Sequence, residues 1–329
     1  MKKINITVVV VTKNRSQDLF NCLLSLVQQN DKDFQVNIIN NNSTDDTKKV
    51  SLGFNKLLKI HHYLEKGKGY PVIYNAGIRT VKTEWVAFID DDCIADKNWI
   101  KDIKEEVNQY PDTPAIIGYS DNFFPDNKYS CYMHFDHNLW QTKGTDSKTR
   151  EVINYQILDN KNLALNIKVM KKYNVWFDES LCEFMNGRAE DGDFGMQLFS
   201  KGISLVYSNK MRIFHKEPQG LKSFIKKLTQ KSLGTYLFTK KWNKHLPYIY
   251  QMNTINNREE NQIKNIINIF NKCFKGIPFY NKFLFILLIP ILNIYKNAIY
   301  TFAFRYYDYY YKNNPEKIKT FIKKNNLTI

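Results

Sequence analysis

The chain has 329 residues, 43% of them hydrophobic and 15% aromatic, which is enough for one large folded unit or two smaller ones. Because the 24% of charged residues come with many large apolar ones, the composition excludes a chain that is disordered throughout. Lys and Arg number 48 against 32 Asp and Glu, and the net charge of +16 favours nucleic acid, anionic lipid or phosphorylated substrates as partners. The five cysteines form no Cys-x-x-Cys pair, which indicates reduced thiols in a cytosol rather than disulfides or a zinc site.

In chain order, the first part of the sequence alternates between short apolar runs and helical patterns. Buried strands are predicted at 6–11, 36–39, 59–64 and 85–89. Helices are predicted at 16–29, 70–81 and 98–107. Ser16 is the expected N-cap of the first helix, and Pro71 suits the first turn of the second. Strand and helix in repetition predict an α/β domain with a mainly parallel sheet.

After residue 114 the alternation loosens. Strands are expected within 153–167, a helix at 188–202, and a short strand pair at 204–207 and 211–214. From residue 221 onward the pattern changes to long amphipathic stretches rich in Lys, Asn, Tyr and Phe. We therefore expect a mostly helical, basic, aromatic-rich unit at 221–329.

Within that unit, segment 283–294 is apolar and is bounded by Lys282 and Lys296. It is short for a membrane span and contains Pro290. Two interpretations stay open: a helix buried in protein, or an interfacial or re-entrant helix next to the aromatic tail 300–312. The lysine clusters of this region are either a solvated helical face or a surface for anionic lipid or a phosphate-bearing acceptor.

Three adjacent aspartates, Asp90, Asp91 and Asp92, directly follow the predicted strand 85–89. Ligands of open α/β sheets bind at the carboxyl ends of the strands. Neighbouring carboxylates there can share a divalent cation such as Mg²⁺ or Mn²⁺, which prefers hard oxygen ligands and leaves positions for the phosphates of a nucleotide. The alternative is a set of N-caps for the next helix, although one Asp would be enough for that.

Two polar loops lie near the same predicted edge. Asn40 and Asn42, within 39–47, can hydrogen-bond a base or ribose, although such residues also populate ordinary turns. Lys68, in the glycine-containing stretch 67–78, could meet a phosphate.

A further acidic group, Glu190, Asp191 and Asp193, stands at the start of the helix predicted at 188–202. Negative charge there complements the helix dipole. Alternatively, a carboxylate crowded by others has a raised proton affinity and can act as a general base. His215, after a predicted strand, is either structural or a neutral ligand to the same metal.

The chain resembles the inverting family 2 glycosyltransferases of the GT-A fold in the order of its motifs, which are "VVVVTKNR", "INNNSTDDT", "NAGI", "FIDDD", "FDE", "EDGDFGMQL" and "IFH". The resemblance covers residues 4–217. It implies a Rossmann-type mixed sheet flanked by helices at 1–220, with a nucleotide-binding half at 1–120 and an acceptor half at 121–220. It also implies a nucleotide-sugar donor and Mn²⁺ or Mg²⁺.

The resemblance assigns roles to the acidic residues by position. Asp90 and Asp92 match the Asp-x-Asp element, in which the first residue typically faces the ribose and the second the metal, with Asp91 between them at the donor. Asp191 matches the catalytic base, and Glu190 lies beside it.

The remaining positions of the motifs match the nucleotide pocket and the metal site. Thr12 and Arg15 match a loop that lines the nucleotide pocket. His215 matches a histidine that completes the metal site with Asp92 and Asp90 in some members. The family commonly has an acidic residue where Asn40 stands, and UDP is the expected nucleotide.

The implied reaction is inverting transfer of a hexose from a UDP-sugar to an acceptor hydroxyl, which Asp191 deprotonates. The expected acceptor is a glycan or a lipid-linked molecule of cell-surface polysaccharide or glycolipid synthesis, reached at the cytoplasmic face of a membrane through peripheral contact. We expect no nucleic-acid partner, and an oligomer stays open.

Two alternative functions fit the sequence less well. A sugar-phosphate nucleotidyltransferase would want a glycine-rich loop after the first strand, and "VTKNRSQD" has no glycine. A non-catalytic lipid- or nucleic-acid-binding protein leaves the acidic strand end unexplained, because carboxylates repel a phosphate chain.

Overall fold

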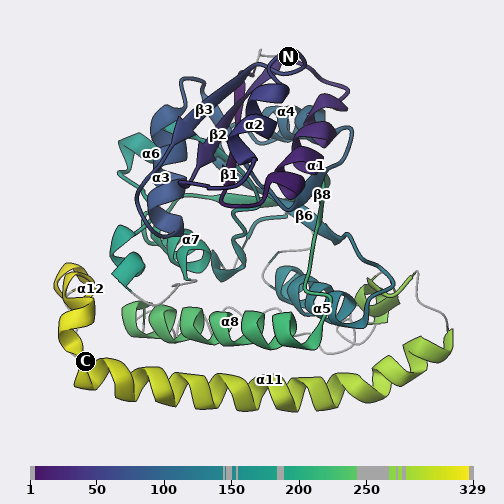
Figure 1. Cartoon of the computed structure of the whole chain (residues 1–329), viewed down its shortest axis with the longest axis vertical. Coiled ribbons are helices and arrows are strands. Elements are labelled where there is room, and N and C mark those ends of the chain that lie inside the picture. Colours follow the sequence, from purple (N-terminus) through teal and green to yellow (C-terminus); the bar gives the residue numbers. More distant parts are fainter. Residues whose placement is uncertain are drawn as a thin grey trace.

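The computed structural model of the protein describes residues 4–143, 145, 150–152, 155–183, 189–242, 267–271, 273–275 and 279–325. Its described residues form an eight-stranded mixed sheet with the order β3-β2-β1-β4-β7-β6-β8-β5. Helices flank this sheet, and a helical layer lies beside it, as Figure 1 shows. The predicted mixed sheet flanked by helices, with a mostly helical C-terminal extension, is confirmed.

The first half of the sheet is parallel. Its strands are β1 (Ile6–Thr12), β2 (Phe34–Asn40), β3 (Ile60–Leu64) and β4 (Trp85–Asp90). The helices between and after them are α1 (Ser16–Val27), α2 (Thr47–Gly53), α3 (Tyr70–Thr80) and α4 (Trp99–Gln109). All seven residues of β1 are buried, because helices cover both faces of the sheet, and the strand is apolar and β-branched for that reason.

The second half adds an antiparallel component. Its strands are β5 (Cys93–Ala95), β6 (Ala115–Asn122), β7 (Asn162–Asn166) and β8 (Leu205–His215). Its helices are α5 (Lys128–Lys143), η1 (Tyr155–Ile157), α6 (Ile167–Lys172), η2 (Glu179–Glu183) and α7 (Glu190–Ser200). Because β7 runs antiparallel to β4 and to β6, its first residues lie where β4 ends.

Two apolar cores fill the two faces of the sheet. One contains Leu19 and Leu23 of α1 together with Ile103 of α4. The other contains Ile78 of α3 and Phe194 of α7. α3 and α7 therefore cover the same face of the sheet.

The helical layer consists of α8 (Leu221–Trp242), α11 (Phe279–Asn313), η4 (Pro315–Ile318) and α12 (Lys319–Asn325). In Figure 1, α8 lies between the sheet domain and α11. Leu237 of α8 shares a buried cluster with Tyr311 of α11 and Phe321 of α12. Among the described residues, no helix combines the length and the apolar character needed to cross a membrane.

The four strands and three helices predicted before residue 110 are confirmed, with ends that differ by a few residues. Ser16 as N-cap is wrong: Arg15 holds that position, and the Ser16 amide donates to Asp45 Oδ2 at 2.9 Å. The strand pair predicted at 204–214 is also wrong.

That segment is the single strand β8, which pairs with β6 on both sides of an irregularity. Its register shifts where Gly118 pairs with Ser208 and Tyr119 pairs with Arg212, so the turn-like residues 209–211 form a bulge.

The predictions for 153–167 and 188–202 agree with the structure in part. Within 153–167 the structure has β7 and the short helix η1, whereas residues 153–154 lie outside the described residues. The helix predicted from residue 188 begins at Glu190, and residues 184–188 also lie outside them. Segment 283–294 belongs to α11, with Pro290 inside the helix.

Candidate active site

The three aspartates lie where β4 ends, and each has different partners. Asp90 is the last residue of β4, and its Oδ1 accepts a hydrogen bond from the Tyr74 hydroxyl at 2.9 Å. Arg15, at the N-cap of α1, donates to Asp91 Oδ1 at 2.9 Å and to Asp92 Oδ2 at 2.8 Å. One guanidinium therefore offsets part of the repulsion among the three carboxylates.

These partners separate the proton affinities of the three groups. Burial and the charge of Asp92 raise the pKa of Asp90 to about 6. Burial raises the pKa of Asp91 to about 7 despite Arg15. Burial also acts to raise the pKa of Asp92, but His215 and Arg15 outweigh it and lower that pKa. Asp92 is therefore the carboxylate most firmly held as an anion.

Pairing between β5 and β8 brings His215 to Asp92. Cys93 pairs with His215 in this ladder, and ligand atoms of Asp92, Cys93 and His215 lie within 4.8 Å of one another. The His215 Nε2 atom lies 3.6 Å from Asp92 Oδ1, while its Nδ1 lies 3.0 Å from Glu217 Oε1. Glu217 in turn pairs with Lys227 of α8 at 2.6 Å.

A carboxylate behind a histidine is the usual support of a metal-binding imidazole, because it fixes the ring and its tautomer. The hard oxygen of Asp92 and the Nε2 of His215 therefore fit Mg²⁺ or Mn²⁺. Burial raises the pKa of the Cys93 thiol well above its usual range, so this sulfur stays protonated and suits a hard cation poorly. Asp90 does not belong to this group of three and is held by Tyr74.

The predicted nucleotide residues follow β1 and β2. Thr12 and Asn40 are buried and pair with each other at the ends of these strands. Asn40 Oδ1 accepts from the Ser43 amide at 2.9 Å, and its Nδ2 lies 3.3 Å from His62 Nε2. Asn42 is exposed, with a left-handed backbone (φ 53°).

Buried Asn41, which the sequence reasoning passed over, joins two loops. Its Nδ2 donates to the carbonyl oxygens of Gly67 at 2.6 Å and Glu65 at 3.1 Å. The exposed Lys68 is thus held near Asn42 and the end of β2. The structure brings all of the predicted nucleotide residues to one edge of the sheet.

Asp191 lies in the first turn of α7, close enough to Asp90 of β4 for their charges to interact. Burial, Glu190 and Asp159 raise the pKa of Asp191 well above its usual range, and Lys161 opposes them. The charge of Asp90 also raises the pKa of Asp191, so the two carboxylates interact electrostatically. A carboxyl group with a raised proton affinity is suited to take a proton from a hydroxyl.

Asp193 has a different role. Its Oδ1 accepts from Trp242 Nε1 at 2.9 Å and lies 2.7 Å from Lys241 Nζ, both at the end of α8. Lys241 also pairs with Asp178 at 2.6 Å, and Lys324 of α12 pairs with Asp178 at 2.7 Å. These contacts tie α7 to the helical layer.

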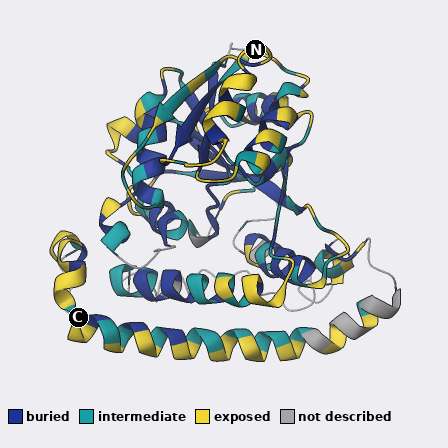
Figure 2. Cartoon of the chain, viewed as in Figure 1, coloured by how far each residue is buried: buried dark blue, intermediate teal, exposed yellow. Residues whose placement is uncertain are grey.

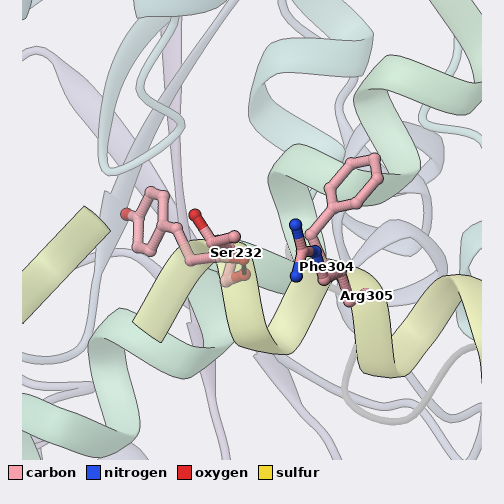
Figure 3. A pocket seen from close by; sticks show the side chains of 5 residues that line it. Ser232, Phe304 and Arg305 are labelled. Atoms are coloured by element: carbon pink, nitrogen blue, oxygen red, sulfur yellow. Dashed lines mark hydrogen bonds between the residues drawn. The ribbon is translucent and has the colours of Figure 1, made fainter. Parts of the chain in front are cut away.

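Two cavities lie between α8 and α11, and no aspartate of the candidate site lines them. Figure 3 shows one of about 300 Å³ with Ser232, Phe304 and Arg305 in its wall. A second, of about 510 Å³, is lined by Thr229 and by apolar and aromatic residues of α11 such as Phe302 and Tyr306.

Two solved structures have a fold similar to that of this chain, which supports the predicted GT-A-like fold class. The mannosyltransferase PcManGT from Pyrobaculum calidifontis, in complex with GDP-Man and Mn²⁺, aligns over 93% of this chain and 87% of its own, with 11% identity and a TM-score of 0.61. S. aureus TarS 1-349 in complex with UDP-GlcNAc aligns over 94% and 92%, with 15% identity and a TM-score of 0.51.

The family model described as Glycosyl transferase family 2 matches residues 7–170, and the chain belongs to this family. The chondroitin synthase of Pasteurella multocida is 25% identical over 76% of this chain, and that of Escherichia coli is 23% identical over 75%. The chain spans only 28% and 39% of the lengths of these two relatives. The predicted membership of family 2 is confirmed.

Proposed function

We propose that the protein is a metal-dependent, inverting hexosyltransferase that moves a sugar from a UDP-sugar to an acceptor hydroxyl. The observation that carries the proposal is that Asp90, at the end of β4 and two residues before Asp92, lies close enough to Asp191 at the start of α7 for their charges to interact. The similar TarS fold, solved in complex with UDP-GlcNAc, supports the choice of UDP.

Asp92 and His215 would hold Mg²⁺ or Mn²⁺, with Asp90 completing the site or facing the ribose. Bound there, the cation would offset the charge that develops on the departing diphosphate. Thr12, Arg15, Asn40, Asn42 and Lys68 lie on the nucleotide side of the site, together with Asp91.

Asp191 acts as the base, with Glu190 beside it raising its proton affinity. The deprotonated acceptor oxygen attacks the anomeric carbon from the face opposite the diphosphate. One base and one displacement give inversion, since a retaining double displacement needs a second carboxylate as nucleophile.

UDP release tests this function. The purified chain is incubated with Mn²⁺ and, in turn, UDP-glucose, UDP-galactose, their N-acetylated forms and UDP-glucuronate. We expect release of UDP from at least one donor, and loss of that release when EDTA removes the metal. Release from none of them, together with no binding of UDP in calorimetry, would contradict the proposal.

We also propose that the acceptor is a glycan or lipid-linked molecule of cell-surface polysaccharide or glycolipid synthesis, met at the cytoplasmic face of a membrane. The chondroitin synthase relatives support a polysaccharide role. In this proposal residues 1–120 bind the nucleotide and 121–220 the acceptor.

The outer face of α11 supports the membrane contact. Large apolar side chains recur there every three or four positions and are strongly exposed, including Ile294 at 70%, Phe302 at 77% and Tyr309 at 71%. Figure 2 shows this exposed edge turned away from the sheet. The one acidic residue of α11, Asp308, is paired with Lys240 and Lys312, so no free carboxylate of this helix repels an anionic surface.

Sedimentation with vesicles tests the membrane contact. We expect the chain to bind phosphatidylserine-containing vesicles and high salt to weaken binding only partly, because apolar contact is not screened. The double variant Ile291→Ser/Phe302→Ser should lose binding, whereas the matched variant Leu52→Ser/Leu57→Ser, with exposed apolar residues on the sheet domain, should keep it. Equal binding by both variants would exclude α11 as the contact.

A further inference from the structure

Lys161 lies in the catalytic site because of the register between β4 and β7. Asn162 pairs with Ile89 in this antiparallel ladder, so Lys161 and Asp90 come next and stand opposite each other. Side chains alternate between the faces of a sheet. Phe88 and Leu163 face the core beneath α3 and α7, and Asp90 and Lys161, two residues from them, therefore point to that same face.

The neighbouring Asn162 fixes this backbone. Its Oδ1 accepts from Trp99 Nε1 at 2.9 Å, and its Nδ2 donates to the carbonyl oxygens of Tyr119 at 3.0 Å and Met211 at 2.8 Å. A Cβ atom at Gly118 would lie only 2.2 Å from the Asn162 side chain, so the fit around it is close. Lys161 thus enters the site from a rigid strand end.

The Lys161 ammonium is held by Asp159. The Lys161 side chain is 12% exposed and that of Asp159 is 7% exposed. Asp159 is itself positioned by the Ser120 hydroxyl at 3.3 Å and by His137 Nε2 at 3.2 Å. An ammonium group has three donor hydrogens, so pairing with Asp159 leaves capacity for another acceptor.

The charge of Lys161 acts on both sides of the site. Lys161 lies close enough to Asp90 and to Asp191 for its charge to act on each carboxylate. Lys161 therefore lies near both the carboxylates assigned to the donor nucleotide and the one assigned to the base. The sugar of a nucleotide-sugar has to lie between these two groups, because its anomeric carbon joins the diphosphate to the incoming hydroxyl.

We propose that Lys161 is a contact for the transferred sugar, in which its ammonium, oriented by Asp159, donates a hydrogen bond to a hydroxyl or carboxylate oxygen of the hexose. This role deepens the proposed function and rests on it. Lys161 then helps to select the donor sugar, whereas the nucleotide is held by other residues.

Calorimetry with Mn²⁺ separates the two parts of the donor. UDP and the five UDP-sugars named above are titrated into the wild type and into Lys161→Met, Lys161→Arg and Asp159→Asn. In Lys161→Met, the affinity for the tightest UDP-sugar should fall by about ten-fold or more, as expected for a lost hydrogen bond to a charged group, while UDP affinity stays within about three-fold. Lys161→Arg should restore part of the loss, and Asp159→Asn should cause a smaller loss of the same kind.

Parallel losses for UDP and UDP-sugar in Lys161→Met would overturn the proposal and move Lys161 to the diphosphate or to a structural role. Unchanged affinities for both would overturn it as well. If Lys161→Met does not fold, Lys161→Arg decides: a changed order of affinities among the five UDP-sugars supports the proposal, and an unchanged order overturns it. A wild type that binds UDP but no UDP-sugar would overturn the proposed function itself, and this inference with it.

Discussion

Asp191→Asn separates the base from its acidic neighbours. The substitution keeps the shape of the side chain and removes the proton acceptor. A positioned general base contributes roughly two to four orders of magnitude to turnover, which is about 3–5 kcal/mol in the barrier. We expect kcat for UDP-sugar consumption to fall by that factor. UDP affinity should stay within a few-fold, since the nucleotide residues follow β1, β2 and β4.

The matched control is Asp193→Asn, two residues along the same helix. Asp193 binds Lys241 and Trp242, so its loss should cost about 2 kcal/mol of unfolding free energy and leave most of the turnover. Thermal unfolding and UDP release are measured on both variants. Near-normal turnover in Asp191→Asn would refute the assignment and move the base to Glu190 or Asp193.

The pH profile gives a second readout of the same base. Turnover requires the ionised Asp191, and burial together with Glu190 raises its pKa, so activity should rise with pH through a value well above that of an ordinary Asp. Glu190→Gln removes a negative neighbour and should move this acidic limb to lower pH. If the acidic limb stays at the same pH in Glu190→Gln, a group other than Asp191 controls it.

Three further predictions concern the strand end and its supports. Asp92→Ala should abolish Mn²⁺-dependent UDP binding in calorimetry, and an unchanged UDP affinity would refute the metal assignment. The same variant should have a lower unfolding temperature, because Arg15 and His215 favour the Asp92 anion in the folded protein. Glu217→Gln should weaken Mn²⁺ affinity by roughly ten- to a hundred-fold in a metal titration, because the Glu217 carboxylate supports His215. Full Mn²⁺ affinity in this variant would show that Glu217 does not support the metal site. With EDTA present, stability against denaturant should fall as pH rises from about 4 to about 7, because the folded state holds protons on Asp91, Asp90 and Asp191 that the unfolded chain releases. Asp91→Asn should make this slope smaller without removing it, and an unchanged slope would show that Asp91 does not contribute.

The parts of the fold that could be predicted are those that local chemistry determines. β1 and β4 are mostly apolar because helices cover both faces of the sheet. Their apolar runs therefore predict buried strands from the sequence alone. β5 has three residues and exists through its pairing with β8, and the bulge of β8 resembles a turn in sequence. Such features depend on partners that are distant along the chain, and the hydrophobic periodicity of a segment does not indicate those partners.

The residues of the candidate site also divide into those that local motifs predict and those that only long-range pairing places. Asp92, His215 and Asp191 belong to recognisable motifs, and the structure brings them to one edge. Lys161 carries no motif, and its position follows only from the register of β7 against β4. Glu217 lies two residues after His215, so an acidic residue closely following a candidate metal histidine could have indicated it.

The helix α8 touches both ends of the catalytic centre. Lys227, near its start, pairs with Glu217 behind His215, and Lys241, near its end, pairs with Asp193 in the helix that carries Asp191. At 1.5 Å per residue these lysines stand about 21 Å apart on one rod. A fragment that stopped at residue 220 would lose both cations at once and leave Glu217, Asp178 and Asp193 as uncompensated buried charges. The sheet domain of this chain therefore depends electrostatically on its helical layer, and a shift of that layer would be transmitted both to Glu217 behind His215 and to the helix that carries Asp191.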